Sequence, residues 1–276
     1  MNERFFATRH SIKPKGEDME SADFPGISEK GVERAKERAA ALLVEVENLE
    51  AGTVVFLGGV SEAVRTRSTA EVYGEEMKRL VAEQGREDVL VYLPEDIASI
   101  EGFTKKVEFL VEQAKAHPTE KLVLDIPLFV KEFGMNDRWM GEDGGLSAYT
   151  KELLKRNNNN EQEALKDWLE TQGVIGDLVG PNPKQVAQEQ LAGIERLRAF
   201  AQKFIPGRPL VIGSVGHSLN LDALAVYLAN NGEVTKEAFE NMQAKMIGET
   251  KMVKISEQDG RPVLQYGDVV IPLETN

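Results

Sequence analysis

Two of the three histidines in this chain follow short apolar runs, and this placement suits chemistry on a ligand. His10 comes shortly after Phe5-Phe6-Ala7, and His217 follows the apolar run 209–213 after three more residues. In an open α/β sheet, ligands bind at the carboxyl ends of the strands. The unperturbed pKa of histidine suits nucleophilic attack and proton transfer near neutral pH. The spacing therefore predicts that both imidazoles lie at one ligand-binding edge of a sheet.

Two arginines, Arg65 and Arg67, stand near the start of a predicted helix that begins at about Glu62. The free N–H groups and the dipole at a helix N-terminus favour an anion, and guanidinium groups bind phosphate oxygens through paired hydrogen bonds. The alternative is a solvated surface charge. Arg67 is two residues from Arg65 and points to another side of the helix, which favours a salt bridge for Arg67.

Elsewhere the apolar pattern predicts strands that alternate with helices. This order is typical of βαβ units, so we expect one α/β domain over residues 1–276, a three-layer α/β/α structure with a mostly parallel central sheet. The predicted strands cover 5–8, 53–57, 89–92, 122–126 and 210–213, the helices 28–49, 62–83, 103–116, 185–204 and 219–230, and a C-terminal hairpin 252–256 and 263–266 around Asp259-Gly260. Residues of about 127–182 hold both tryptophans and an asparagine run, and we expect a helical, lid-like insertion there.

The composition narrows the possible partners. The chain has 276 residues with 33 Lys and Arg against 46 Asp and Glu, a net charge of −13, which argues against a nucleic-acid or membrane partner. It has no cysteine, which excludes disulfides, thiolate metal sites and a cysteine nucleophile. No secretory signal or membrane-spanning run is evident, so a cytoplasmic protein is expected. The oligomeric state is not indicated.

Four segments, in this order, resemble motifs of the histidine phosphatase superfamily, the phosphoglycerate-mutase-like proteins. They are Thr8-Arg9-His10-Ser11 for its Arg-His-Gly signature, residues 26–31 for its Leu-Thr-x-x-Gly helix start, residues 61–70 for its Ser-Pro-Leu-x-Arg-Ala-x-Gln-Thr-Ala segment, and Gly216-His217-Ser218 for its second histidine. The resemblance implies that His10 attacks phosphorus to form a phosphohistidine, and that Arg9, Arg65 and His217 surround the phosphoryl group. It implies no metal and no other cofactor, because cationic side chains match the phosphoryl charge.

The leaving alkoxide needs a proton donor, ideally a carboxylic acid. In the branch that this sequence resembles, the acid follows the third strand in a Leu-x-Glu segment, which Leu93-Pro94-Glu95 matches. Glu95 is therefore the candidate acid, with a solvated loop charge as the alternative. Glu101 is the reserve candidate, because Glu101-Gly102 comes one residue early for the family's Gly-x-x-Glu-Gly continuation. Ser218 stands where another branch has an aspartate.

Departures from the family pattern bear on the expected activity. Ser11 replaces a glycine and could add a hydroxyl to the phosphate site or crowd it, and Glu62 puts a negative charge near the anion site. Lys13 and Lys15 could meet an anionic substrate or be exposed loop lysines. The signatures of true mutases after the first histidine are missing. We therefore expect a metal-independent phosphohydrolase for a small phosphomonoester; the alternatives are a non-catalytic phosphate-ligand-binding protein on the same fold and a phosphomutase.

Overall fold

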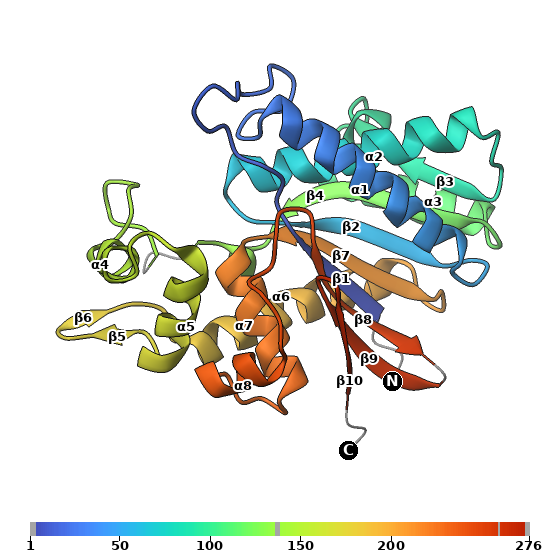
Figure 1. The fold of residues 1–276 in the computed structure, drawn as a ribbon. Helices are drawn as coiled ribbons and strands as arrows, with labels where there is room; N and C mark the ends of the chain where they lie inside the picture. Colours follow the sequence, from blue (N-terminus) through green and yellow to red (C-terminus); the bar gives the residue numbers. More distant parts are fainter. Residues whose placement is uncertain (1–3, 136–138, 259, 274–276) are drawn as a thin grey trace.

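The computed structural model describes residues 4–135, 139–258 and 260–273, and its centre is an eight-stranded sheet (Figure 1). The strand order is β10-β9-β8-β1-β7-β2-β4-β3. Strands β1, β7, β2, β4 and β3 run parallel, and the C-terminal strands β8, β9 and β10 are antiparallel. The bounds are β1 (Arg4–Arg9), β2 (Val54–Val60), β3 (Val89–Tyr92), β4 (Lys121–Phe129), β7 (Leu210–Gly216), β8 (Met252–Gln258), β9 (Arg261–Tyr266) and β10 (Val269–Pro272).

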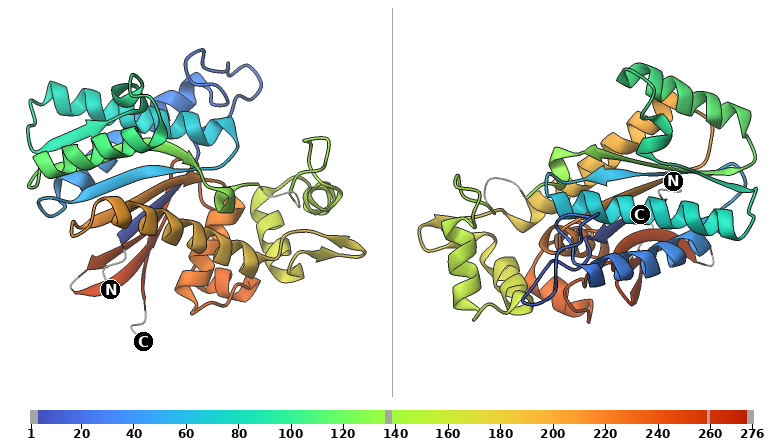
Figure 2. Two further views of the ribbon diagram at one scale, coloured as in Figure 1. Left: turned by 180° about the vertical axis from the view of Figure 1, so that it is seen from behind. Right: turned by 90° about the horizontal axis from the view of Figure 1, so that it is seen from above.

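Helices cover both faces of this sheet (Figure 2). One face carries α1 (Glu29–Glu47) and α2 (Val64–Glu83). The other carries α3 (Phe103–Ala116), α6 (Pro183–Phe204) and α7 (Ser218–Ala229). The predicted three-layer α/β/α structure with a mostly parallel sheet is therefore confirmed.

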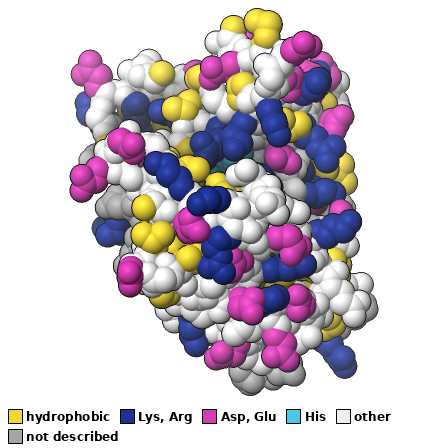
Figure 3. Space-filling model, turned by 60° about the vertical axis from the view of Figure 1, so that its left-hand side comes forward, with side chains coloured by type: hydrophobic (Ala, Val, Ile, Leu, Met, Phe, Trp, Pro, Cys, Tyr) yellow, Lys and Arg dark blue, Asp and Glu magenta, His cyan; other side chains and the backbone are white. Residues whose placement is uncertain are grey.

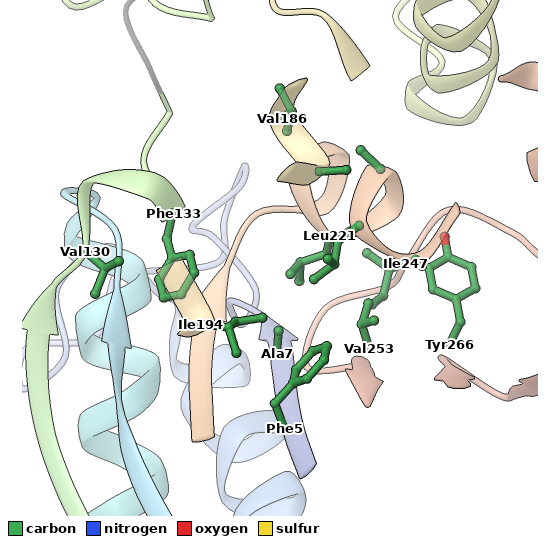
Figure 4. Close-up of a cluster of buried hydrophobic side chains, with 14 of the residues drawn as sticks. Phe5, Ala7, Val130, Phe133, Val186, Ile194, Leu221, Ile247, Val253 and Tyr266 are labelled. Carbon is green, nitrogen blue, oxygen red and sulfur yellow. The ribbon is translucent and has the colours of Figure 1, made fainter. Parts of the chain in front are cut away.

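The two cores arise from the alternation of side chains along each strand. In β1, Phe5 and Ala7 point into the layer of α6 and α7, whereas Phe6 points into the layer of α1 and α2. Figure 4 shows Phe5 and Ala7 beside Ile194 and Val253 in the first of these cores. Strands β1, β7 and β2 are buried along almost their whole length, so the polar side chains that follow these strands lie at the sheet edge.

The region between β4 and α6 forms a small unit beside the sheet (Figure 1). It contains α4 (Ala148–Arg156), α5 (Glu161–Thr171), β5 (Val174–Ile175) and β6 (Leu178–Val179), and α8 (Lys236–Asn241) packs against α5. The rings of Trp139 and Trp168 meet edge to face with centroids 5.0 Å apart, and Trp168 Nε1 donates to the Pro181 carbonyl at 2.7 Å. Residues 127–129 of the expected insertion belong to β4.

The C-terminal hairpin is confirmed by the antiparallel pairing of β8 and β9. Asp259 of its expected turn lies outside the described residues. Strand β10 was not among the predicted strands. Among the described residues, no helix combines the length and apolar character needed to cross a membrane.

One carboxylic acid is buried beneath α2. Asp125 in β4 has no exposed surface, and an added Cβ at Gly74 would come within 1.9 Å of its Oδ2. Burial raises the pKa of Asp125 well above its usual value, and the negative charges of Glu71 and Glu95 raise it further. The folded state therefore binds a proton at Asp125 that the unfolded chain releases at a lower pH.

This linkage gives a stability prediction for Asp125→Asn. A group whose pKa is higher in the folded state than in the unfolded chain favours folding most at pH values below its unfolded-state pKa. This contribution to the free energy of unfolding is lost as the pH rises through the folded-state pKa. The amide carries no ionisable proton, so we expect a higher melting temperature, by about 2–4 °C for each kcal/mol gained, with a larger gain at about pH 8 than at pH 5. Thermal unfolding at both pH values measures this. Asp268→Asn, at an 84% exposed side chain, is the control. A gain that is equal at both pH values would contradict the prediction.

Candidate active site

Three polar residues follow three neighbouring strand ends. His10 comes directly after β1, His217 after β7 and Ser61 after β2, and these strands lie side by side and run parallel. The backbone N–H of His10 donates to the Gly216 carbonyl at 3.0 Å, which extends the β1–β7 pairing to the histidine itself. The two imidazole rings are 5.4 Å apart between centroids, at an angle of 63°. The structure thus brings the two predicted histidines together at one edge.

The orientation of His10 leaves one ring nitrogen available. Its Nδ1 is 2.7 Å from the Ser11 carbonyl oxygen, and since a carbonyl only accepts, Nδ1 carries the hydrogen. Burial and the charge of Arg65 lower the pKa of His10 to about 3. The ring is therefore neutral near pH 7, and its lone pair is on Nε2. Among the described residues no hydrogen bond is made to Nε2, so it can act as a nucleophile.

Ser11 holds His10 in this orientation. It is completely buried; its N–H donates to Thr69 Oγ1 at 3.0 Å, and its hydroxyl donates to the Gly31 carbonyl at 2.6 Å. Gly31 is required there, because an added Cβ would lie 2.5 Å from the carbonyl oxygen of Ile12. The Ser11 hydroxyl is thus bonded to the first turn of α1, and neither alternative raised by the sequence, a phosphate ligand or a crowding group, describes its role.

His217 is fixed in the opposite tautomer. Its Nδ1 lies 3.3 Å from Arg65 Nη2, and since a guanidinium only donates, Nδ1 accepts. Its Nε2 therefore carries the hydrogen and donates to Ser61 Oγ at 2.8 Å. Burial and the charges of Arg65 and His10 lower the pKa of His217 well below its usual value. Both rings are therefore neutral near pH 7.

Arg65, Arg9 and Lys13 supply positive charge around the two rings. Arg65 is in the first turn of α2, and the charges of Arg9 and Lys13 also lower the pKa of both histidines. Figure 3 shows Lys and Arg side chains gathered beside a small area of histidine, with acidic side chains among them. Lys15 is exposed, and its backbone forms a β-bridge with that of Asp18 in the loop that follows β1.

A series of buried hydrogen bonds on the core side of the site fixes the Arg9 side chain. Its Nη1 donates to the Ile247 carbonyl at 2.7 Å, and the N–H of Ile247 donates to Asp222 Oδ1 at 2.9 Å. The hydroxyl of Tyr266 donates to the same oxygen at 2.5 Å. Burial raises the pKa of Asp222 to about 7. Figure 4 shows Ile247 and Tyr266 close together in the core behind the site.

Three glutamates also lie around the site. The sequence indicated Glu62 but neither Glu161 nor Glu249. Arg9 Nη2 is 3.5 Å from Glu161 Oε2 and 3.2 Å from Glu249 Oε1. Glu161 opens α5 in the insertion, and Glu249 lies in the loop before β8, so no motif spacing links either to Arg9. Glu62, whose charge the sequence placed near the anion site, raises the pKa of Arg65 against the effect of burial.

The candidate acids Glu95 and Glu101 lie elsewhere. Glu95 is exposed in the short 3-10 helix η1 (Pro94–Ile97) that follows the edge strand β3, and its charge acts on Glu75 and Asp125. Three strands separate β3 from β1, roughly 19 Å at the usual strand spacing. Glu101 is exposed just before α3. The structure brings neither glutamate into contact with His10 or His217. Arg67 forms an ion pair with Glu71 at 3.1 Å, as predicted.

The arrangement suits an anion. The N-termini of α2 and α7 both begin at this edge, and their free N–H groups carry partial positive charge. Within the described ranges, no group of three or more His, Cys, Asp or Glu side chains is placed to hold a metal ion. Two arginines, two helix ends and a free imidazole nitrogen can hold a phosphoryl group and attack it.

Comparisons with known proteins give limited similarity. No protein-family model matches the chain, and no curated protein matches it in sequence. The solved structure of mycobacterial glucosyl-3-phosphoglycerate phosphatase is 16% identical, with a TM-score of 0.46, over 97% of this chain and 99% of that one. Phosphoglycerate mutase from Bacillus anthracis is 14% identical, with a TM-score of 0.47, over 95% and 91%. At these values the similarity does not identify the activity of this chain.

The two tautomers can be tested by NMR of the imidazole nitrogens. We expect the hydrogen on Nδ1 in His10 and on Nε2 in His217, because a carbonyl faces the first and a guanidinium the second. Both rings should stay neutral between about pH 5 and 8, because their pKa values are lowered. The variants His10→Ala and His217→Ala assign the signals. A protonated ring near pH 7, in the absence of phosphate, would contradict the assignment.

Proposed function

We propose that this protein is a metal-independent phosphohydrolase that cleaves a small phosphomonoester through a phosphohistidine on Nε2 of His10. The observation that carries this proposal is the neutral His10 imidazole, fixed through Nδ1 and facing Arg65 and His217. The four ordered motifs of the histidine phosphatase superfamily support the same function independently of the geometry.

In the first step, Nε2 attacks phosphorus and the bond from phosphorus to the ester oxygen breaks. The leaving oxygen takes a proton from an acid and departs as an alcohol. In the second step, water attacks phosphorus, the bond from phosphorus to Nε2 breaks, and inorganic phosphate leaves the regenerated His10. Splitting one displacement into two in this way is the advantage of covalent catalysis.

Arg65 and His217 stabilise the transferring group in this scheme. The guanidinium of Arg65 matches the negative charge on the equatorial oxygens, as does that of Arg9. Burial and the charge of Arg65 lower the pKa of His217, whereas the charge of a phosphate dianion would raise it. Substrate binding therefore favours protonation of His217 at Nδ1, which would then donate to a phosphoryl oxygen.

The insertion takes part through Glu161. Its ion pair with Arg9 ties the start of α5 to the phosphate site, and the Gln162 side chain accepts a hydrogen bond from the Met246 N–H at 2.7 Å. We infer that this unit shapes the wall of the substrate pocket and selects the alcohol part of the phosphomonoester.

A non-catalytic phosphate-binding protein is the second candidate. The observation that favours it is the position of Glu95, which leaves the site without the acid that the family resemblance implied. Binding needs the cations and the helix ends but no proton donor. Turnover that depends on His10 separates the two candidates.

Hydrolysis of an aryl phosphate with a chelator present tests the proposal. We expect activity in the native protein and its loss by more than about a thousandfold in His10→Ala, because the nucleophile is removed. Acid quenching during turnover should trap a phosphoenzyme in the native protein alone. His117→Ala, at a histidine at the end of α3, is the matched control.

Two results would overturn this assignment. Equal activity in both proteins would exclude His10 as the nucleophile. Vanadate or phosphate binding without any turnover would establish the binding protein instead.

A further inference from the structure

We propose that Glu62 is the general acid of this site, the group that protonates the leaving oxygen when His10 is phosphorylated. This inference rests on the proposed hydrolysis. Its starting point is the position of Glu95 at the far edge strand, which leaves the alkoxide without that donor. An alkoxide is a poor leaving group, so a site that cleaves alkyl esters needs an acid within reach.

Glu62 is linked through its neighbours in the chain to His217 and Arg65, the two residues proposed to stabilise the phosphoryl group. The preceding residue, Ser61, accepts a hydrogen bond from His217 at 2.8 Å. Arg65 follows three residues later, and among charged groups Glu62 has the largest effect on the pKa of Arg65. The exposed Glu62 carboxylate therefore lies near enough to act on the charge of the guanidinium that contacts His217, although it does not pair with it directly.

The backbone of residues 134–135 confines the Glu62 side chain. Its Oε1 accepts the N–H of Met135 at 2.8 Å, and an added Cβ at Gly134 would lie 2.6 Å from Oε2. The Gly134 carbonyl in turn accepts from Asn220 Nδ2 at 3.1 Å, in the first turn of the helix that follows His217. Within the described part of the chain, nothing hydrogen-bonds to Oε2. One oxygen is thus anchored, and the other can carry the proton.

The other two glutamates at the site differ from Glu62 in their ion pairs. Glu161 and Glu249 are 3.5 Å and 3.2 Å from Arg9 and pair with it directly. Glu62 forms no ion pair within 4.0 Å with any Lys, Arg or His among residues 4–135, 139–258 and 260–273. It can therefore lose its charge without breaking a direct pair.

The proton balance closes over the two steps. The proton on Glu62 moves to the leaving oxygen as the ester bond breaks, and the carboxylate remains. This carboxylate then takes a proton from the water that attacks the phosphohistidine. The same residue acts first as acid and then as base, and it ends in the protonation state in which it began.

The test compares two substrates of one enzyme. A nitrophenyl phosphate releases a phenolate that leaves without a proton, whereas an alkyl phosphate such as glycerol 2-phosphate releases an alkoxide that needs one. In Glu62→Gln we expect hydrolysis of the alkyl ester to fall by about 10²–10⁴-fold. Formation of the phosphoenzyme from the aryl ester should change by less than about tenfold, because that step uses no acid. Glu62→Asp should recover part of the alkyl activity.

Matched variants separate catalysis from structure. Glu95→Gln and Glu249→Gln should not distinguish between the two substrates. If Glu62 only anchored residues 134–135, Glu62→Gln would lower both reactions equally, which would overturn the proposal. Full alkyl activity in Glu62→Gln, or a native enzyme that cleaves aryl esters alone, would overturn it as well. A protein with no turnover on either ester would contradict the proposed hydrolysis itself.

Discussion

The hydrogen bond from His10 Nδ1 to the Ser11 carbonyl determines what this site can do. It fixes the tautomer, and so it places the only lone pair of the ring on Nε2. The position of this carbonyl is fixed because Ser11 itself forms hydrogen bonds to the Gly31 carbonyl in α1 and to Thr69 in α2. Two helices on one face of the sheet thus orient the imidazole that follows β1, the nucleophile of the proposed reaction. Burial then keeps the ring uncharged.

Charge at the site is balanced locally, although the chain as a whole carries −13. A buried guanidinium without a counterion is costly, and Glu161 and Glu249 supply this counterion to Arg9. A phosphate dianion offers the same guanidinium a second anionic partner. In the proposed reaction the carboxylates and the substrate would therefore compete for Arg9, and this competition would link phosphate binding to the position of α5 in the insertion. Lys13 and Arg65 add positive charge without such tight pairing.

Much of the fold followed from local patterns. Apolar runs of strand length marked β1, β2 and β7, and helical spacing of apolar residues marked α1 and α6, because each buries a regular face. The short elements of the insertion were not predicted, since strands of two residues carry no period. Glu95 shows a different limit. Strand β4 comes after β3 in the chain but pairs between β2 and β3, so it displaces Glu95 from the histidines. No local pattern records the order of strands in a sheet.

The sequence by itself determined the groups that lie at the sheet edge. His10, His217 and Arg65 stand directly after strands or at a helix start, and parallel strands must end on one side of a sheet. The tertiary structure alone decided how these groups are charged and oriented. The tautomers of both histidines depend on Ser11, Ser61 and Arg65, and the partners of Arg9 come from segments more than a hundred residues away. Such contacts depend on packing between distant segments, because hydrogen bonds and ion pairs act only over a few ångströms.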